Sequence, residues 1–236
     1  FDTGEFYNFW FSTGTPTFLV NLLKGRNQVQ IGKVLVDQSA FESYDIENLD
    51  TLPLLFQTGY STIKEKREFG IFLMDYPNRE VETSLLRHLI GSYRHHSAAR
   101  TTPVVIQLRQ AFLDQEIEQI ITIINSLFQS IPSHIFIKEK EAYYHSLVYL
   151  VFQYLGQFIE AEVNTATGRI DAVVYTDSQV YVLEFKLDAS AEVALKQIRE
   201  KGYADKYLTS GKKVLAMGIN FSSTEKQVTD WKMESY

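Results

Sequence analysis

Cysteine is absent from this chain of 236 residues. Without it the protein cannot form disulfide bonds, cysteine-ligated zinc sites or cysteine nucleophiles, and we expect it in a reducing cytoplasm. Long hydrophobic runs are absent too: no stretch of about 20 apolar residues is present, so no membrane-spanning helix is expected. Basic residues number 23 against 29 acidic ones, and the resulting net charge of −6 argues against a protein that coats nucleic acid over its whole surface.

The phosphate-binding motif G-x-x-x-x-G-K-[ST] is missing as well. Gly32-Lys33 and Gly211-Lys212 have neither the earlier glycine nor the following hydroxyl residue, so ATP binding through this motif is excluded. No signal peptide is visible, and the chain begins at Phe1 instead of methionine. We therefore expect a fragment whose upstream part is not included.

The chain does contain two alternating runs that are typical of a β-hairpin. Residues 169–175 and 180–186 each alternate in side-chain character, which is the pattern of a strand. Between them, Asp177-Ser178 is a candidate two-residue turn. If Thr176 pairs with Gln179, the numbers of paired residues sum to 355. The alternation also predicts that Ile170 shares a face with Ala172 and Val174.

This register brings three charged side chains together. Asp171 lies directly across from Glu184, and Lys186 lies on the same strand face as Glu184. Two opposed carboxylates repel each other unless a cation lies beside them, and a bound Mg²⁺ would supply two positive charges. The alternative is a solvent-exposed strand face on which Lys186 balances the two acids.

The residues that follow the hairpin are locally basic. Between Lys196 and Lys213 there are six basic and two acidic residues. This excess could contact a phosphate backbone, although a solvated helix face explains the charge equally well.

The hairpin belongs to a coherent α/β pattern in residues 136–236. The sequence predicts a helix over 139–155, strands over 158–163, 169–176 and 179–187, a helix from Ser190 to Leu208 and a strand over 214–219. The first three strands form an antiparallel meander, and the last helix crosses over to a fourth strand parallel to the third. The expected architecture is an αβββαβ core with a mixed sheet and helices on its faces.

The upstream residues are predicted to form smaller units. In residues 1–77 we expect a helix from Thr15-Pro16 to Leu23, a strand at 34–36, a helix capped by Asp50 and two strands at 60–63 and 70–74, an order that suits a winged-helix-like domain. In residues 78–135 we expect a helix capped by Asn78 and one long helix over 111–131, together forming a bridge. The adjacent His95-His96 is interpreted as a helix end at the surface.

The combination of motifs resembles the PD-(D/E)XK nuclease superfamily. More closely, it is similar to a bacterial family in which the nuclease domain follows an AAA-type ATPase-like domain. The motifs that carry the resemblance are Tyr143-Tyr144-His145-Ser146-Leu147, Gly168-Arg169-Ile170-Asp171, Leu183-Glu184-Phe185-Lys186 and Gln197-Ile198-x-x-Lys201-Gly202-Tyr203-Ala204. Upstream, residues 7–19, 59–63 and 76–81 continue the likeness. Ile170 stands where the proline that names the superfamily would be.

The resemblance implies a restriction-endonuclease-like fold and a role for each matching residue. Asp171 and Glu184 would be metal ligands, together with the Phe185 carbonyl and Glu141 from the first core helix. Lys186 would orient or polarise the attacking water, and Gln197 would support the site. His145 and Tyr203 are further candidates. Hard oxygen ligands favour Mg²⁺ or Mn²⁺ over zinc.

The function expected on these grounds is metal-dependent hydrolysis of phosphodiester bonds, with DNA as the substrate. Residues 1–77 would then be the end of an ATPase-like region. The alternative is a nuclease-like fold that has lost catalysis and binds nucleic acid or protein partners.

Overall fold

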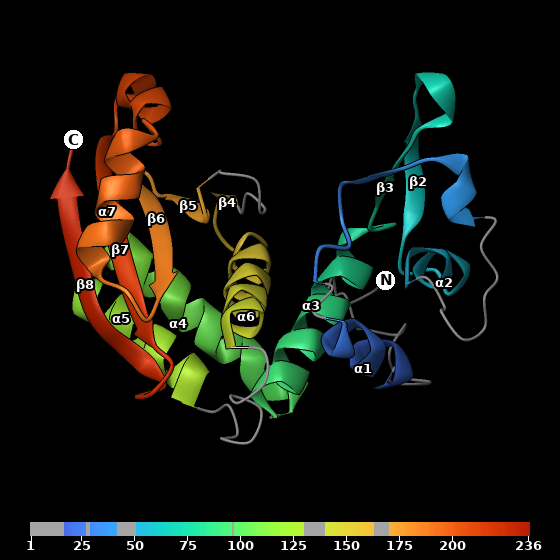
Figure 1. The fold of residues 1–236 in the computed structure, drawn as a ribbon, viewed down its shortest axis with the longest axis horizontal. Helices are drawn as coiled ribbons and strands as arrows, with labels where there is room; N and C mark the ends of the chain where they lie inside the picture. Colours follow the sequence, from blue (N-terminus) through green and yellow to red (C-terminus); the bar gives the residue numbers. More distant parts are fainter. Residues whose placement is uncertain (1–16, 27–28, 42–50, 96, 130–139, 163–169) are drawn as a thin grey trace, which may run out of the picture.

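The computed structural model describes residues 17–26, 29–41, 51–95, 97–129, 140–162 and 170–236, and the side chains of residues 140–142 and 162 are not described. Two groups of elements lie side by side, with the amino-terminal elements in one and the large sheet in the other (Figure 1). Helix α3 (Arg79–Arg94) lies between them. None of the described helices combines the length and the apolar character needed to cross a membrane.

The amino-terminal group contains two short helices and a three-stranded sheet. Helices α1 (Thr17–Gly25) and α2 (Thr51–Gln57) accompany strands β1 (Val34–Val36), β2 (Thr62–Lys66) and β3 (Phe72–Asp75). Both neighbours of the central β3 are antiparallel to it. The predicted helices and strands are therefore present, while the predicted caps Thr15 and Asp50 lie outside the described residues.

In its described residues, 78–95 and 97–129, the bridging region contains three α-helices where the sequence predicts two. The cap of α3 is confirmed, because the Asn78 side chain accepts a hydrogen bond from the Val81 amide. The single helix predicted over 111–131 is wrong: α4 (Thr101–Asp114) and α5 (Ile117–Gln129) are separated by Gln115, whose φ of 62° ends the first helix. A turn at Ala98–Arg100 connects α3 to α4.

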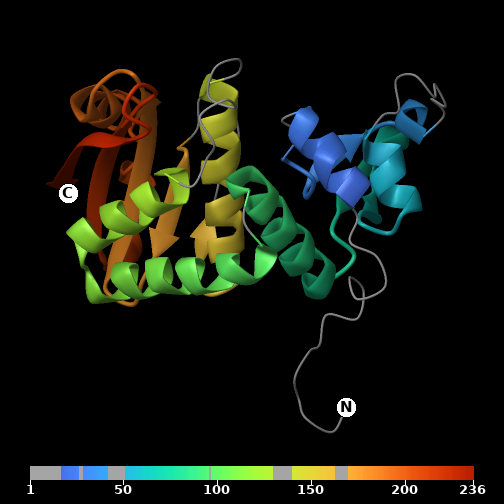
Figure 2. The same cartoon turned by 90° about the horizontal axis from the view of Figure 1, so that it is seen from below.

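Helix α6 (Lys140–Leu155) lies at the centre of the molecule, between α3 and the large sheet (Figure 2). Most of its described side chains are buried, including Tyr144, Leu147, Tyr154 and Leu155, and His145 is the exposed one. A buried helix needs no polar face, which explains why its sequence lacks the amphipathic pattern of a surface helix.

The large sheet has the strand order β4-β5-β6-β7-β8. Its strands are β4 (Ala161–Glu162), β5 (Ala172–Tyr175), β6 (Gln179–Leu187), β7 (Lys213–Ser222) and β8 (Gln227–Ser235). All neighbours are antiparallel except β6 and β7, which are parallel, as predicted. The predicted hairpin register is also confirmed, because Ala172 pairs with Leu183 and Tyr175 with Val180.

Helices cover both faces of this sheet. Helix α7 (Ala191–Glu200) packs on one face, while α4, α5 and α6 lie on the other (Figures 1 and 2). The predicted extent of α7 to Leu208 is wrong: the helix ends at Glu200, Gly202 adopts a φ of 61°, and a 3-10 turn spans Asp205–Ser210. Strand β8, which the sequence does not predict, adds an edge to the expected mixed α/β core.

Candidate active site at the open end of the β5–β6 hairpin

The hairpin ends in the two predicted carboxylates. Asp171 immediately precedes the first paired residue of β5, and Glu184 follows the paired residue Leu183 in β6. The Asp171 Oδ2 atom accepts a hydrogen bond of 2.8 Å from the Phe185 amide. β5 does not extend far enough to pair with Phe185. The Asp171 carboxylate therefore accepts the hydrogen bond of the Phe185 amide that a backbone carbonyl of β5 would otherwise accept.

The predicted face of Ile170 is wrong. Ile170 packs with Val173 and Val182 in the cluster under α7, whereas Ala172 and Val174 belong to the core on the opposite side of the sheet. Alternation holds only inside the regular strand, and Ile170 lies before β5 begins. This local change leaves Asp171 beside Phe185.

Glu184 is almost completely buried, with 2% of its surface exposed. Its strand face is covered by α7, so the solvent-exposed strand face considered as an alternative is excluded. Burial and then the Asp171 charge raise the pKa of Glu184 to about 7, against the lowering effects of Lys186 and of the Asp171 backbone amide. Burial also raises the pKa of Asp171, against the lowering effects of the Phe185 amide, His145 and Lys186.

Lys186 is held between an acid and an amide. Its Nζ atom donates to Glu184 Oε1 at 2.8 Å and to Gln197 Oε1 at 2.7 Å. Gln197 comes from α7, so one helix and one strand position the amine together. This Lys186 contact leaves the other Glu184 oxygen, Oε2, as a buried atom with no hydrogen-bond partner among the described residues.

Gly218 allows α7 to approach the sheet beside these residues. It pairs with Glu184 across the β6–β7 ladder. A Cβ atom at this position would lie 2.3 Å from the Ala191 carbonyl oxygen and 3.0 Å from the Ala194 Cβ. Because Gly218 has no side chain, α7 can lie close to β7, and Gln197 of α7 comes within hydrogen-bonding distance of Lys186.

His145 lies on the other side of the site. It is exposed, and it borders a small cavity together with Lys186, Tyr144 and Phe221. The cavity has a volume of about 10 Å³, which is about the space that one water molecule needs. The predicted His145 thus reaches the same site as Lys186.

The other candidates are placed differently. Glu141 lies in the first turn of α6, but its side chain is outside the described residues. Tyr203 is 9% exposed and packs in the hydrophobic cluster under α7. Tyr149 of α6 is not part of this site: burial, and then the charges of Glu82 and Asp75, raise its pKa to about 12.

The residues present fit a divalent cation that prefers oxygen ligands. Glu184 Oε2 is a buried carboxylate oxygen without a partner, and Asp171 lies beside it. In a strand, the amide and carbonyl of one residue point towards the same neighbour, so the Phe185 carbonyl is directed to the side of Asp171. Among the described residues no three Asp, Glu, His or Cys side chains form a metal cluster, so the further ligands would be water, a backbone oxygen or an acid such as Glu141.

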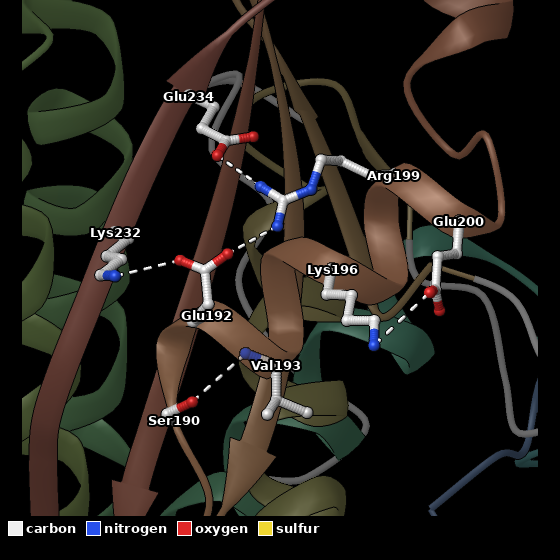
Figure 3. Close-up of polar contacts among 8 residues, drawn as sticks. All are labelled: Ser190, Glu192, Val193, Lys196, Arg199, Glu200, Lys232 and Glu234. Atoms are coloured by element: carbon white, nitrogen blue, oxygen red, sulfur yellow. Dashed lines mark hydrogen bonds and ion pairs between the residues drawn. The ribbon is translucent and has the colours of Figure 1, made fainter.

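Charges on the outer surface of α7 are paired with each other. Figure 3 shows Arg199 between Glu192 and Glu234, and it also shows the ion pair between Lys232 of β8 and Glu192. Lys196 lies 3.6 Å from Glu200. The positive charges of Lys196 and Arg199, which contribute to the predicted phosphate-binding region, are thus balanced by neighbouring acids.

Two polar residues that support the site are not identified from the sequence. Asp230 of β8 accepts a hydrogen bond from the Ala191 amide at the start of α7, and Asn220 of β7 accepts one from Ala189. Both fix the segment that connects Lys186 to Gln197. A glycine inside a strand pattern could have identified Gly218, because such a residue marks a close approach of another backbone.

Two comparisons with known proteins give matches to this chain. A curated protein of Azotobacter chroococcum mcd 1, named "Uncharacterized protein in vnfD 5'region", is 34% identical over 248 residues. That match covers 100% of this chain and 48% of the relative, so the chain spans about half the relative's length. No solved structure matches. Residues 139–231, which run from the start of α6 into β8, match the family model described as the PD-(D/E)XK nuclease superfamily.

Proposed function

We propose that the protein is a metal-dependent nuclease that hydrolyses phosphodiester bonds in DNA. The observation that carries this proposal is the buried, unpartnered Oε2 atom of Glu184 beside Asp171. A buried carboxylate oxygen without a partner is costly, and two neighbouring carboxylates add repulsion to that cost. A bound cation would remove both penalties.

Asp171, Glu184, the Phe185 carbonyl and Glu141 would hold Mg²⁺ or Mn²⁺. When bound, such an ion supplies positive charge that neutralises the phosphodiester and lowers the pKa of a coordinated water. The Phe185 amide holds the Asp171 carboxylate in place through its hydrogen bond. The same strand segment thereby positions both an acidic ligand and a carbonyl ligand.

Lys186 acts on the nucleophile and on the charge that develops during the reaction. Its ammonium group is a hydrogen-bond donor that orients the attacking water and stabilises negative charge on the phosphate. Gln197 accepts one of its N–H groups and thereby directs the others. Because an amide does not titrate, Gln197 is a positioning residue that keeps Lys186 in place throughout the reaction.

The proposal includes an arrangement for the whole chain. Residues 136–236 form the nuclease-like domain, residues 78–135 form the helical bridge, and residues 1–77 are the winged-helix-like end of an ATPase-like region located upstream. We place the protein in the cytoplasm. These assignments are supported by the motif pattern.

The test is a cleavage assay on purified protein with supercoiled, linear and single-stranded DNA and with RNA, in Mg²⁺ or Mn²⁺. We expect cleavage by the parent and a loss of at least about a hundredfold in Asp171→Asn and Lys186→Ala, because each change removes several kcal/mol of charge stabilisation. Asp114→Asn is the matched control, since Asp114 contacts Gln110 at the end of α4. Equal rates in the parent and both site variants would refute a catalytic role and favour the non-catalytic binding module.

A further inference from the structure

A basic surface lies at the carboxyl end of α3. Residues 83–113 contain four arginines and three histidines but no aspartate or glutamate. They cover most of α3, the turn Ala98–Arg100 and most of α4. In a chain with a net charge of −6, such a segment creates a local positive potential.

One further cation joins this segment in space. Lys24 of α1 donates to the Ser92 carbonyl at 2.8 Å, and its Nζ lies 3.0 Å from Nε2 of His95. We define the α3 basic surface as Lys24, Arg87, His95 and Arg100; Arg94, next to His95, is buried. Lys24 and Arg94 complement the negative end of the α3 dipole, so their charges have a structural explanation.

Arg87 and Arg100 have no comparable explanation. Arg100 is exposed at the amino end of α4, where a helix carries partial positive charge and a second cation is unfavourable. Arg87 lies two turns before Arg94 on the same side of α3. Within the described part of the chain, neither guanidinium group forms a hydrogen bond or an ion pair. An external anion would neutralise both charges.

The α3 basic surface is connected to the candidate active site through α6. The Tyr143 hydroxyl donates to the Tyr93 carbonyl, and the two rings are 4.8 Å apart. His145 follows two residues later and borders the cavity with Lys186. In Figure 1 the carboxyl end of α3 and the amino end of α6 both lie in the lower half of the molecule. One helix, about 10 Å wide, therefore separates the two regions, which corresponds to about three base pairs of rise.

We propose that the α3 basic surface binds the phosphate backbone of a nucleic acid and leads it across the amino end of α6 to Lys186. The choice of this anion rests on the proposed nuclease function. The outer face of α7 is the poorer candidate, because Arg199 and Lys196 are already paired with acids there (Figure 3). Contacts at the α3 basic surface lie about three or more nucleotides from the scissile bond.

The experiment measures binding without cleavage. Fluorescence anisotropy with duplex and single-stranded oligonucleotides is recorded in EDTA, at KCl concentrations from about 50 to about 200 mM. The test variant Arg87→Gln Arg100→Gln removes two charges that have no internal partner among the described residues. The matched control Lys196→Gln Lys232→Gln removes two charges that are paired with acids of α7.

Each phosphate contact contributes about 0.9 to the salt slope for a duplex and about 0.7 for a single strand. The slope is that of the logarithm of the binding constant against the logarithm of the KCl concentration, and we expect its magnitude to be smaller by about 1.4 to 1.8 in the test variant. If the lines of variant and parent meet near 1 M KCl, the variant binds about 25- to 60-fold more weakly at about 0.1 M. The control should keep the slope of the parent. An unchanged slope in the test variant, equal losses in both variants, or no binding by the parent would overturn the proposal.

Cleavage data separate this inference from the proposed function. Binding that depends on Arg87 and Arg100 without any metal-dependent cleavage supports the α3 basic surface and contradicts the nuclease assignment. Metal-dependent cleavage together with an unchanged salt slope in the test variant supports the nuclease assignment and overturns the proposed binding role of the α3 basic surface.

Discussion

Lys186 of β6 and Gln197 of α7 are joined by a hydrogen bond of 2.7 Å between Nζ and Oε1. The partners are 11 residues apart and come from different layers of the domain. Because Glu184 accepts a second N–H from the same amine, the direction of the third is determined. An amine with a defined direction is what a water-orienting group requires.

The Lys186–Gln197 contact predicts a kinetic effect with little loss of stability. Gln197→Ala should lower kcat by about 10- to 100-fold, the usual cost of removing a group that supports a metal-site residue, and should leave KM nearly unchanged. Steady-state cleavage kinetics and thermal unfolding check this. Gln153→Ala is the control, since it also removes one side-chain amide contact, here to Glu82 on α3. Equal kcat in both variants would contradict the positioning role.

A second prediction concerns the close approach of α7 to β7. Gly218→Ala places a Cβ atom 2.3 Å from the Ala191 oxygen, and backbone cannot move as easily as a flexible side chain. We expect a loss of about 1–3 kcal/mol in the free energy of unfolding, the usual cost of overpacking, together with lower activity as Gln197 moves from Lys186. Urea denaturation measures the first effect.

Gly25→Ala is the control for Gly218→Ala. A Cβ atom at Gly25, the last residue of α1, has nothing within 4 Å, so alanine should be neutral or stabilising there. A Gly218→Ala protein as stable as the parent would show that α7 does not depend on this close approach.

The site was largely predictable from the sequence, because its geometry follows from a short hairpin. Strand alternation and a two-residue turn determine the register, and the register places Asp171 just before β5, close to Glu184. The hydrogen bond between Asp171 and the Phe185 amide lies outside the paired residues and is not contained in this pattern. The alternation pattern does not indicate how deeply each side chain is buried. The burial of Glu184 depends on α7 packing over the strand, which depends on Gly218.

The errors in the predicted fold also result from tertiary packing. The break between α4 and α5 occurs at Gln115, a residue without the usual preference for a positive φ, so no glycine marks it. Strand β8 is an edge strand in which only Val228 is buried, and its sequence therefore lacks a strong apolar alternation. Both features are decided by tertiary packing.

A third prediction follows from the raised pKa of Glu184. In metal-free protein the folded state keeps its proton up to about pH 7, while the unfolded chain releases it near 4.5. Between these values the unfolded state binds fewer protons, so stability falls as the pH rises. The fall has an upper limit of about 3 kcal/mol, and the raised pKa of Asp171 acts in the same direction.

Urea denaturation in EDTA at several pH values checks this dependence. Glu184→Gln should reduce the slope of the free energy of unfolding against pH. The variant should be more stable than the parent above pH 7, because no buried charge forms. Glu118→Gln, at an exposed position of α5, should follow the parent. A parent whose stability rises through this window would contradict the buried, protonated Glu184.

The last prediction separates metal binding from catalysis. Isothermal titration calorimetry with Mn²⁺ should show binding by the parent and a loss of at least about tenfold in affinity, about 1.4 kcal/mol, in Asp171→Asn. The amide oxygen of asparagine can still accept the hydrogen bond of the Phe185 amide, so the local backbone is kept while the negative charge is lost. Asp114→Asn loses one charge at the distant end of α4 and should bind like the parent. Retained Mn²⁺ affinity in Asp171→Asn would contradict its role as a ligand, because the affinity of an oxygen site for a divalent ion depends on the number of its charged ligands.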